Sequence, residues 1–146
     1  MNVDHEAFTW QWVKHLIDSM DAHLDEPTRI RVMESCGRAC AREGPAHVAQ
    51  EFGGNLDGWL AVLAQWHGGE EYIRKDADAV HVICAECLCV MVKDGPARLP
   101  DTYCYCSRGW MKETFEAVVG KPVQVQIVES IKRGGQECRF IIRGWA

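Results

Sequence analysis

Apolar residues in the first 69 positions recur every three or four residues, which is the spacing of amphipathic helices. Residues 8–20 form the first stripe, whose expected inward side chains are Phe8, Trp12, Val13, Leu16, Ile17 and Met20. A second helix is expected to begin beside Pro27, a third at Pro45 and a fourth after Asn55, because proline is tolerated in a first turn and asparagine caps helices. The fourth helix should turn five side chains inward, Leu56, Trp59, Leu60, Leu63 and Trp66.

From residue 70 the period changes to two, which is the spacing of strands. Residues 72–84 should form a hairpin, residues 87–92 a buried strand, and residues 104–106 a short extended segment. A helix capped by Ser107 and ending at Gly120 should follow. Residues 122–131 and 137–143 then alternate as two strands joined by a glycine turn. The predicted fold class is α+β, with N-terminal helices packed with an antiparallel sheet and a C-terminal helix followed by a β-hairpin.

The length of 146 residues is enough to bury a core without disulfide bonds. We expect a single domain over residues 1–146, with a helical part at 1–69 and a β-rich part at 70–146 that contains one helix. The net charge of −5 and the scattered Lys and Arg argue against nucleic acid and against a membrane surface as partners. The N-terminus lacks the basic-then-apolar order of a signal peptide, so we expect a cytoplasmic protein.

The eight cysteines are the main chemical signal. In a reducing compartment, closely spaced cysteines are more often metal ligands or redox groups than disulfides. A Cys-x-Cys arm in an extended segment points both sulfurs to one side. Two such arms can close one tetrahedral site, made of Cys87, Cys89, Cys104 and Cys106. Zinc is the expected metal, and Cu(I) or an iron–sulfur cluster also suits thiolates.

A competing metal site uses the cysteines of the helical half. Cys36 and Cys40 share a helix face if the second helix continues through Gly37, and they can join Cys104 and Cys106 around one ion. The pattern does not choose between the two sets. The simpler alternative is that several thiols are core residues, since free cysteine is often buried.

Glu129 is the second chemical signal, because a carboxylate at an inward strand position must be paired, bind a metal or stay neutral. With a two-residue loop after its strand, Glu129 faces Cys138 across the hairpin, and a longer or bulged loop would move this register. We place four residues in a candidate ligand pocket between sheet and helices: Glu129, Cys138, Trp110 and His81. Cys84 or Cys138 with His81 is also conceivable as a nucleophilic pair.

Residues 120–140 resemble the end of the 4-vinyl-reductase-like domains and of the bacterial family of L-2-amino-thiazoline-4-carboxylate hydrolases. The shared pattern is a helix, a glycine, a strand ending in Glu129, a glycine turn and Cys138-x-Phe140. The segments at 36–40 and 104–110 look like a small Cys-rich bacterial family related to these. The resemblance implies an α+β domain with a pocket between sheet and helices, often dimeric, in which relatives sense small molecules.

Some of these relatives hold zinc through a glutamate and cysteines near this hairpin. Glu129 and Cys138 match that glutamate and the last cysteine, whereas Ile131 or Lys132 stands where a further cysteine is found. The Cys-x-Cys arms can replace the missing ligand. We therefore expect a metal-binding and small-molecule-binding domain, with a sensor role and a homodimer as compatible extensions.

Two alternatives stay open. One is a hydrolase of small cyclic amides or thiazolines, with a thiolate or a metal-bound water as nucleophile and Glu129 as base. The other is a thiol redox or metal-handling protein, in which the cysteine pairs cycle or pass on an ion. No catalytic residue is assigned from the sequence.

Overall fold

The structure is a computed structural model that describes residues 4–89 and 92–146. Its α-helices are α1 (His5–His23), α2 (Glu26–Arg42), α3 (Pro45–Gln50), α4 (Leu56–His67) and α5 (Tyr105–Val119). Its strands are β1 (Ile73–Lys75), β2 (Val80–Cys84), β3 (Gln124–Glu129) and β4 (Cys138–Arg143). Short 3₁₀ helices lie between them: η1 (Glu70–Tyr72), η2 (Asp101–Cys104) and η3 (Ile131–Arg133). This arrangement confirms the predicted α+β class.

The helix ends follow the capping residues of the sequence. The Asp4 side chain accepts a hydrogen bond from the Ala7 amide at the start of α1, and the Asn55 side chain accepts one from the Gly58 amide at the start of α4. After α5, Gly120 adopts the left-handed conformation (φ 74°) that glycine tolerates without steric cost. These local interactions explain why the N-terminal helices lie where the sequence pattern predicts them.

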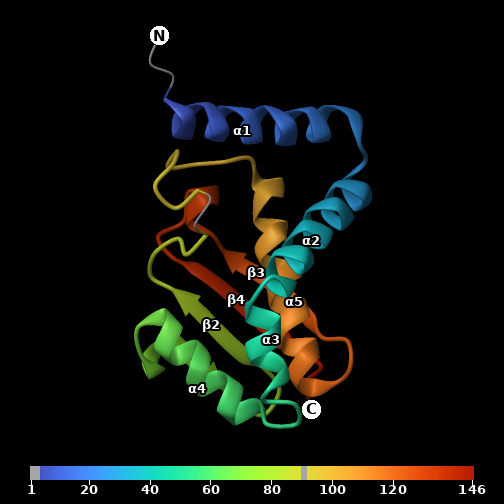
Figure 1. Ribbon diagram of the computed structural model, residues 1–146, viewed down its shortest axis with the longest axis vertical. Coiled ribbons are helices and arrows are strands. Elements are labelled where there is room, and N and C mark those ends of the chain that lie inside the picture. The colour runs from blue at the N-terminus through green and yellow to red at the C-terminus, as the bar shows by residue number, and fades with distance from the viewer. Residues whose placement is uncertain (1–3, 90–91) are drawn as a thin grey trace.

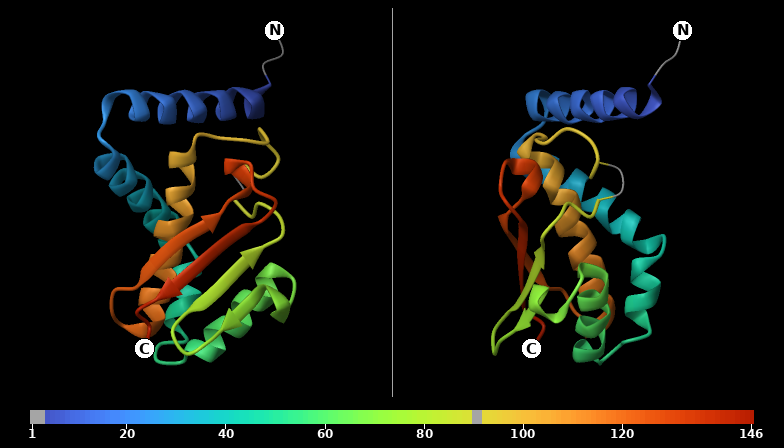
Figure 2. Two further views of the ribbon diagram at one scale, coloured as in Figure 1. Left: turned by 180° about the vertical axis from the view of Figure 1, so that it is seen from behind. Right: turned by 90° about the vertical axis from the view of Figure 1, so that its left-hand side faces the viewer.

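The strands form one antiparallel sheet in the order β1-β2-β4-β3. Helices α4 and α5 lie against one face, α2 and α3 pack on the far side of α5, and α1 lies across one end (Figure 1, Figure 2). The side chains on the helix-facing side of the sheet are buried; they are Val80, Val82, Cys84, Val125, Phe140 and Ile142. The molecule therefore has three layers, with the sheet on one side and α2 and α3 on the other.

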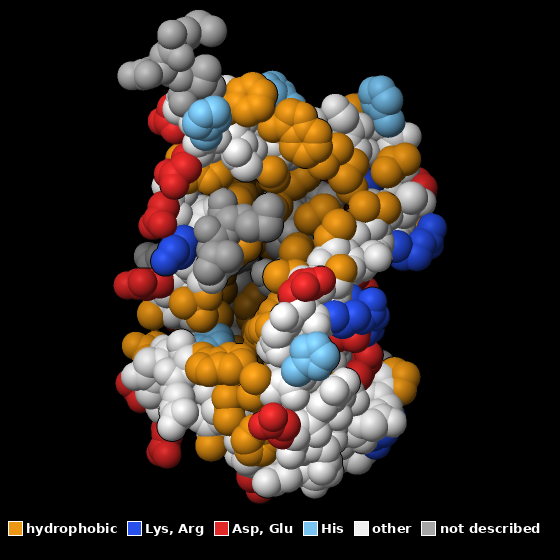
Figure 3. All heavy atoms as spheres, viewed as in Figure 1, with side chains coloured by type: hydrophobic (Ala, Val, Ile, Leu, Met, Phe, Trp, Pro, Cys, Tyr) orange, Lys and Arg blue, Asp and Glu red, His pale blue; other side chains and the backbone are white. Residues whose placement is uncertain are grey.

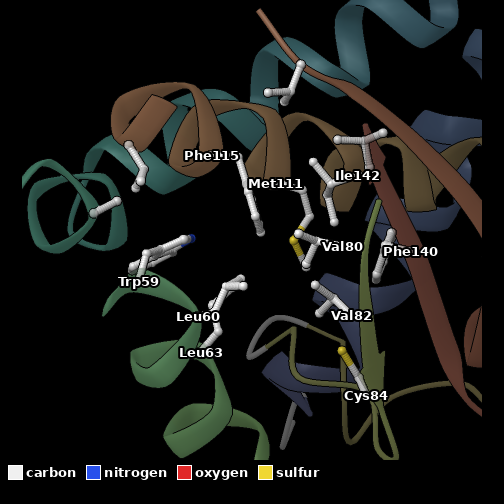
Figure 4. Packing of buried hydrophobic residues seen from close by; sticks show 14 residues of the cluster. Trp59, Leu60, Leu63, Val80, Val82, Cys84, Met111, Phe115, Phe140 and Ile142 are labelled. Carbon is white, nitrogen blue, oxygen red and sulfur yellow. The ribbon is translucent and has the colours of Figure 1, made fainter. Parts of the chain in front are cut away.

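Two apolar clusters hold these layers together. In the larger one, side chains of α4 face those of α5, β2 and β4 (Figure 4). The smaller one joins α1, α2, η2 and the segment before η2, and its buried members are Ile17, Met33, Val92, Leu99, Tyr103 and Cys104. Each fully buried large apolar side chain stabilises the fold by ~1.5–3 kcal/mol, so these clusters fix the layer order.

Helices α2 and α5 cross at two glycines. A methyl group at Gly37 would overlap the carbonyl oxygen of Cys106, and one at Gly109 would overlap that of Glu34. Beside the crossing, Arg38 forms ion pairs with two glutamates of α5. The start of α5 is thereby held against the middle of α2, and both segments carry cysteines.

Some expected inward side chains are exposed, which corrects the sequence-based assignment. In α1 Ile17 is buried, but Phe8, Trp12 and Leu16 are exposed, as is Trp66 in α4. The reason is that α1 contacts α2 and η2 at only a few positions. The apolar stripe of α1 is wider than this contact, so part of the stripe stays exposed. On the face shown in Figure 3, hydrophobic side chains gather over α1 and around a hollow in the middle of the face.

Two predicted extended segments are also wrong. The buried strand was predicted at residues 87–92, but residues 87–89 have no regular structure and Val92 lies in a turn; residues 90–91 lie outside the described residues. Residues 104–106 are helical, because η2 ends at Cys104 and α5 begins at Tyr105, ahead of the predicted cap at Ser107. Among the described residues, no helix combines the length and apolar character that crossing a membrane requires.

Candidate functional site

The helical conformation at the start of α5 separates the two sulfurs of the second Cys-x-Cys arm. Successive residues of a helix are rotated by about 100°, so side chains two positions apart point in nearly opposite directions. Cys104 Sγ lies 2.9 Å from the Ser130 hydroxyl, next to η3. Cys106 instead has the thiols of Cys36 and Cys40 on α2 among its neighbours. The eight cysteines therefore divide into two groups, on either side of this segment.

The first group, which we name the sheet-end group, consists of Cys84, Cys87, Cys104 and Cys138. Cys84 and Cys138 are directly paired in the register of β2 and β4. Burial raises the pKa of the Cys84 thiol to about 12, and the neighbouring Cys138 and Cys87 add to this rise. Burial also raises the pKa of Cys104, against the effect of its hydrogen bond to Ser130. Cys84 and Cys104 are therefore neutral thiols at neutral pH.

The second group, which we name the crossing group, consists of Cys36, Cys40, Cys89 and Cys106. Helix α2 runs unbroken through Gly37, so Cys36 and Cys40 lie on one helix face, and both are exposed. Burial raises the pKa of Cys106 to about 12, and the neighbouring thiols of Cys89, Cys40, Cys36 and Cys104 add to the rise. Cys89 Sγ is 3.2 Å from the hydroxyl of Tyr103.

Neither group forms a preformed metal site within residues 4–89 and 92–146. No three or more His, Cys, Asp or Glu side chains lie in a position to hold one ion, and all eight cysteines are free thiols. The expected set of Cys87, Cys89, Cys104 and Cys106 is split between the two groups, because residues 104–106 are not extended. The competing set is split in the same way, since the Cys104 thiol lies beside the Ser130 hydroxyl and not in a ligand cluster with Cys36 and Cys40. Zinc binding stays a prediction.

The expected pocket residues lie in different places. Glu129 pairs in register with Arg139 across a bulge, and its carboxylate accepts a hydrogen bond from the Gln136 amide (2.8 Å), in the turn before β4. The extra residues of η3 lengthen this turn and the bulge shifts the register, which is why Arg139 instead of Cys138 stands opposite Glu129. His81 points away from the helices, with Nε2 3.2 Å from Asp76 Oδ2. Trp110 is half-buried on α5, against the larger apolar cluster.

A Cys–His pair that the sequence did not suggest lies at the end of α4. His67 Nδ1 is 3.3 Å from Cys84 Sγ and 3.1 Å from the Ile83 carbonyl oxygen. Because the carbonyl only accepts, Nδ1 carries the hydrogen and cannot take a proton from Cys84. Burial also lowers the pKa of His67. The pair is a neutral thiol beside a neutral imidazole, without the depressed thiol pKa of a nucleophilic cysteine.

The layer between α4 and the sheet contains one buried donor without an acceptor. Trp59 is fully buried, and its indole Nε1 has no hydrogen-bond partner among the described residues. The nitrogen points toward Phe115, into the space between α4 and α5 (Figure 4), and the two rings meet edge to face with centroids 6.5 Å apart. An unpaired buried donor costs ~1–3 kcal/mol. From the sequence, Trp59 reads as an ordinary core residue of an aromatic stripe.

Of the two helices that lie against the sheet, α4 makes the fewer contacts with other helices. It touches α5 at few positions, whereas α2 lies along α5 over much of its length. The side chains that α4 contributes to the core, Trp59, Leu60 and Leu63, are nevertheless buried. Helix α4 is therefore held in place mainly by these apolar side chains and less by contacts with other helices.

In fold, the chain is similar to the phenol-responsive sensory domain of the transcription activator PoxR, whose crystal structure contains phenol. The two chains are 18% identical with a TM-score of 0.56, over 98% of this chain and 76% of that one. At this level of identity the likeness concerns the fold alone. No curated protein matches the sequence. A family model described as "Family of unknown function (DUF6144)" matches residues 2–144, and the chain therefore belongs to this family.

Proposed function

We propose that this protein is a sensory domain that binds a small aromatic molecule between α4 and the sheet. The observation that carries the proposal is the unpaired indole N–H of Trp59 inside an otherwise apolar layer. A bound hydroxyl or carbonyl oxygen would accept this hydrogen bond and remove the cost of the buried donor. The similar fold of a phenol-responsive domain supports the idea of such a ligand.

The ligand would have an aromatic body and one hydrogen-bond acceptor. The facing walls offer Leu60, Leu63, Val80, Val82, Met111 and Phe115, none of which is charged. A charged ligand would lose its hydration here without gaining a partner. A ligand between these two walls would shift α4 relative to the sheet, which is a change that a partner protein can detect.

The hydrolase alternative has less support. The His67–Cys84 pair lacks a base for the thiol, and Glu129 is engaged by the backbone of its own turn. Kinship with the 4-vinyl-reductase-like domains and zinc binding remain parts of our proposal. The kinship rests on the pattern of Glu129, the glycine turn and Cys138, and zinc rests on the two cysteine groups.

The test is a titration of ¹⁵N-labelled protein with phenol, anisole and toluene, followed through the tryptophan indole resonances. Phenol and anisole carry an acceptor oxygen, so they should shift the Trp59 signal and bind about tenfold more tightly than toluene, which corresponds to one hydrogen bond of ~1.4 kcal/mol. Trp59→Phe identifies the signal and should abolish the preference for the oxygen-bearing ligands.

Trp145→Phe is the matched control, because Trp145 Nε1 is also buried without a partner, whereas the Trp145 ring is only partly buried and has the ammonium of Lys75 on β1 over it. It should leave the ligand preference unchanged. Equal binding of all three compounds, or an unchanged preference in Trp59→Phe, would contradict the proposal.

A further inference from the structure

A depression of the surface lies beyond the end of the sheet, away from Trp59. Its volume is about 540 Å³, and it is lined by the segment that follows β2 and by the turn between β3 and β4. Lys132 and Lys93 contribute the cationic side chains and Glu86 the acidic one, while Ala97 and Ile131 provide apolar surface. No residue of the α4 layer belongs to this lining.

Lys132 is the unusual residue of the depression. It is only 4% exposed, and its ammonium group donates one hydrogen bond, to the Pro96 carbonyl oxygen at 2.7 Å. An ammonium has three N–H donors, and a carbonyl supplies no negative charge. Lysine is almost never this deeply buried without a paired anion, because an uncompensated buried charge is strongly destabilising.

The part of the chain that the structure describes supplies no such anion. None of the ion pairs among the described residues includes Lys132, and the residues outside that description carry no carboxylate side chain. Glu129 is the nearest carboxylate along the chain, and it accepts a hydrogen bond from the Gln136 amide instead of pairing with Lys132. The Cys87 thiol also lines the depression, but burial raises its pKa, so it is not a thiolate at neutral pH.

We infer that this depression binds a small molecule with a single carboxylate group, which pairs with the buried ammonium of Lys132. The carboxylate oxygens would accept the remaining N–H donors, and a short apolar body would lie on Ala97 and Ile131. Two lysines and one glutamate leave one net positive charge in the lining, so a monoanion matches the site better than a phosphate dianion. This inference is independent of the proposed function, since it does not involve Trp59.

The experiment is a titration of ¹⁵N-labelled protein with butyrate, with butyramide as the neutral counterpart and inorganic phosphate as the competing anion, all at one ionic strength. Butyrate should shift the backbone amides of Gly134, Gly135 and Gln136, and should bind at least tenfold more tightly than butyramide or phosphate. Equal binding of butyrate and butyramide, or tighter binding of phosphate, would overturn the assignment without any variant.

Variants then identify the cation. Lys132→Met should weaken butyrate binding at least tenfold, and Lys132→Arg, which keeps the charge, should retain most of it. Lys93→Met is the matched control and should weaken butyrate binding by no more than about threefold, because Lys93 is exposed and its charge is screened by water. Trp59→Phe should leave butyrate binding unchanged. Unaltered affinity in a folded Lys132→Met protein would refute the role of this residue.

Discussion

Replacing Gly37 by alanine should weaken the crossing of α2 and α5. The added methyl group would overlap the Cys106 carbonyl oxygen and lie 2.9 Å from the Trp110 backbone nitrogen. Both obstacles are backbone atoms of α5, which cannot move aside by changing a rotamer. The helices would have to separate, at the expense of the packing and ion pairs along their shared surface.

The expected change in the free energy of unfolding follows from two opposing effects of the substitution. Alanine in a helix interior is favoured over glycine by ~1 kcal/mol. Overpacking at a rigid contact costs ~1–3 kcal/mol and sometimes more, and the backbone overlap at Gly37 places it at the upper end. We expect a net loss of about 2 kcal/mol in the free energy of unfolding, which lowers the Tm of a chain of this length by ~4–8 °C.

The assay is urea unfolding followed by far-UV circular dichroism, which gives the free energy of unfolding directly. Gly44→Ala is the control, because nothing lies within 4 Å of the added methyl group there; it should change stability by less than ~1 kcal/mol. A Gly37→Ala protein as stable as the wild type, or more stable, would refute the close crossing of α2 and α5.

Three further predictions concern the thiols, the pH dependence and the metal. Cys36 and Cys40 are exposed and should be the first thiols to react with an aromatic disulfide reagent, whereas the buried Cys84 and Cys104 should react only on unfolding; fast reaction of Cys84 would contradict the burial. Because burial lowers the pKa of His67 below 6.5, the unfolded chain takes up a proton in acid that the native chain does not. The free energy of unfolding should therefore fall as the pH drops from about 7 to about 5, and fall less in His67→Gln; equal slopes would remove His67 as the cause. Protein purified without oxygen or added metal should contain about one zinc per chain if one cysteine group closes around an ion, and elemental analysis that finds none would end the zinc prediction.

The secondary structure was largely readable from the sequence, because its determinants are local. A helix depends on a spacing of three to four and on caps such as Asp4 and Asn55, and these act within one turn of the chain. The strands around Val80 and Val125 follow from strict alternation, which is also local. The hairpin of β1 and β2 and the return of the chain in β4 were predicted for the same reason.

The arrangement of the cysteines was decided by the tertiary structure. The same Cys-x-Cys spacing points two sulfurs together in a strand and apart in a helix, and the conformation at residues 104–106 depends on α5 packing against Gly37. The partner of Glu129 depends on the length of the turn before β4, which the short η3 helix extends, and the partner of Cys138 depends on β2 pairing with β4 from a distant part of the chain.

The two proposed binding sites also required the tertiary structure. Trp59 and Lys132 look ordinary in the sequence, one as a core aromatic residue and the other as a charge in a turn. Only the packing of segments distant in sequence shows that an indole N–H and an ammonium group are buried without the acceptor and the anion that each requires. The sequence alone thus determined the helices, the strands and the α+β class, whose causes lie within a few residues. The tertiary structure decided which polar groups are removed from water, because burial depends on every segment that packs around them.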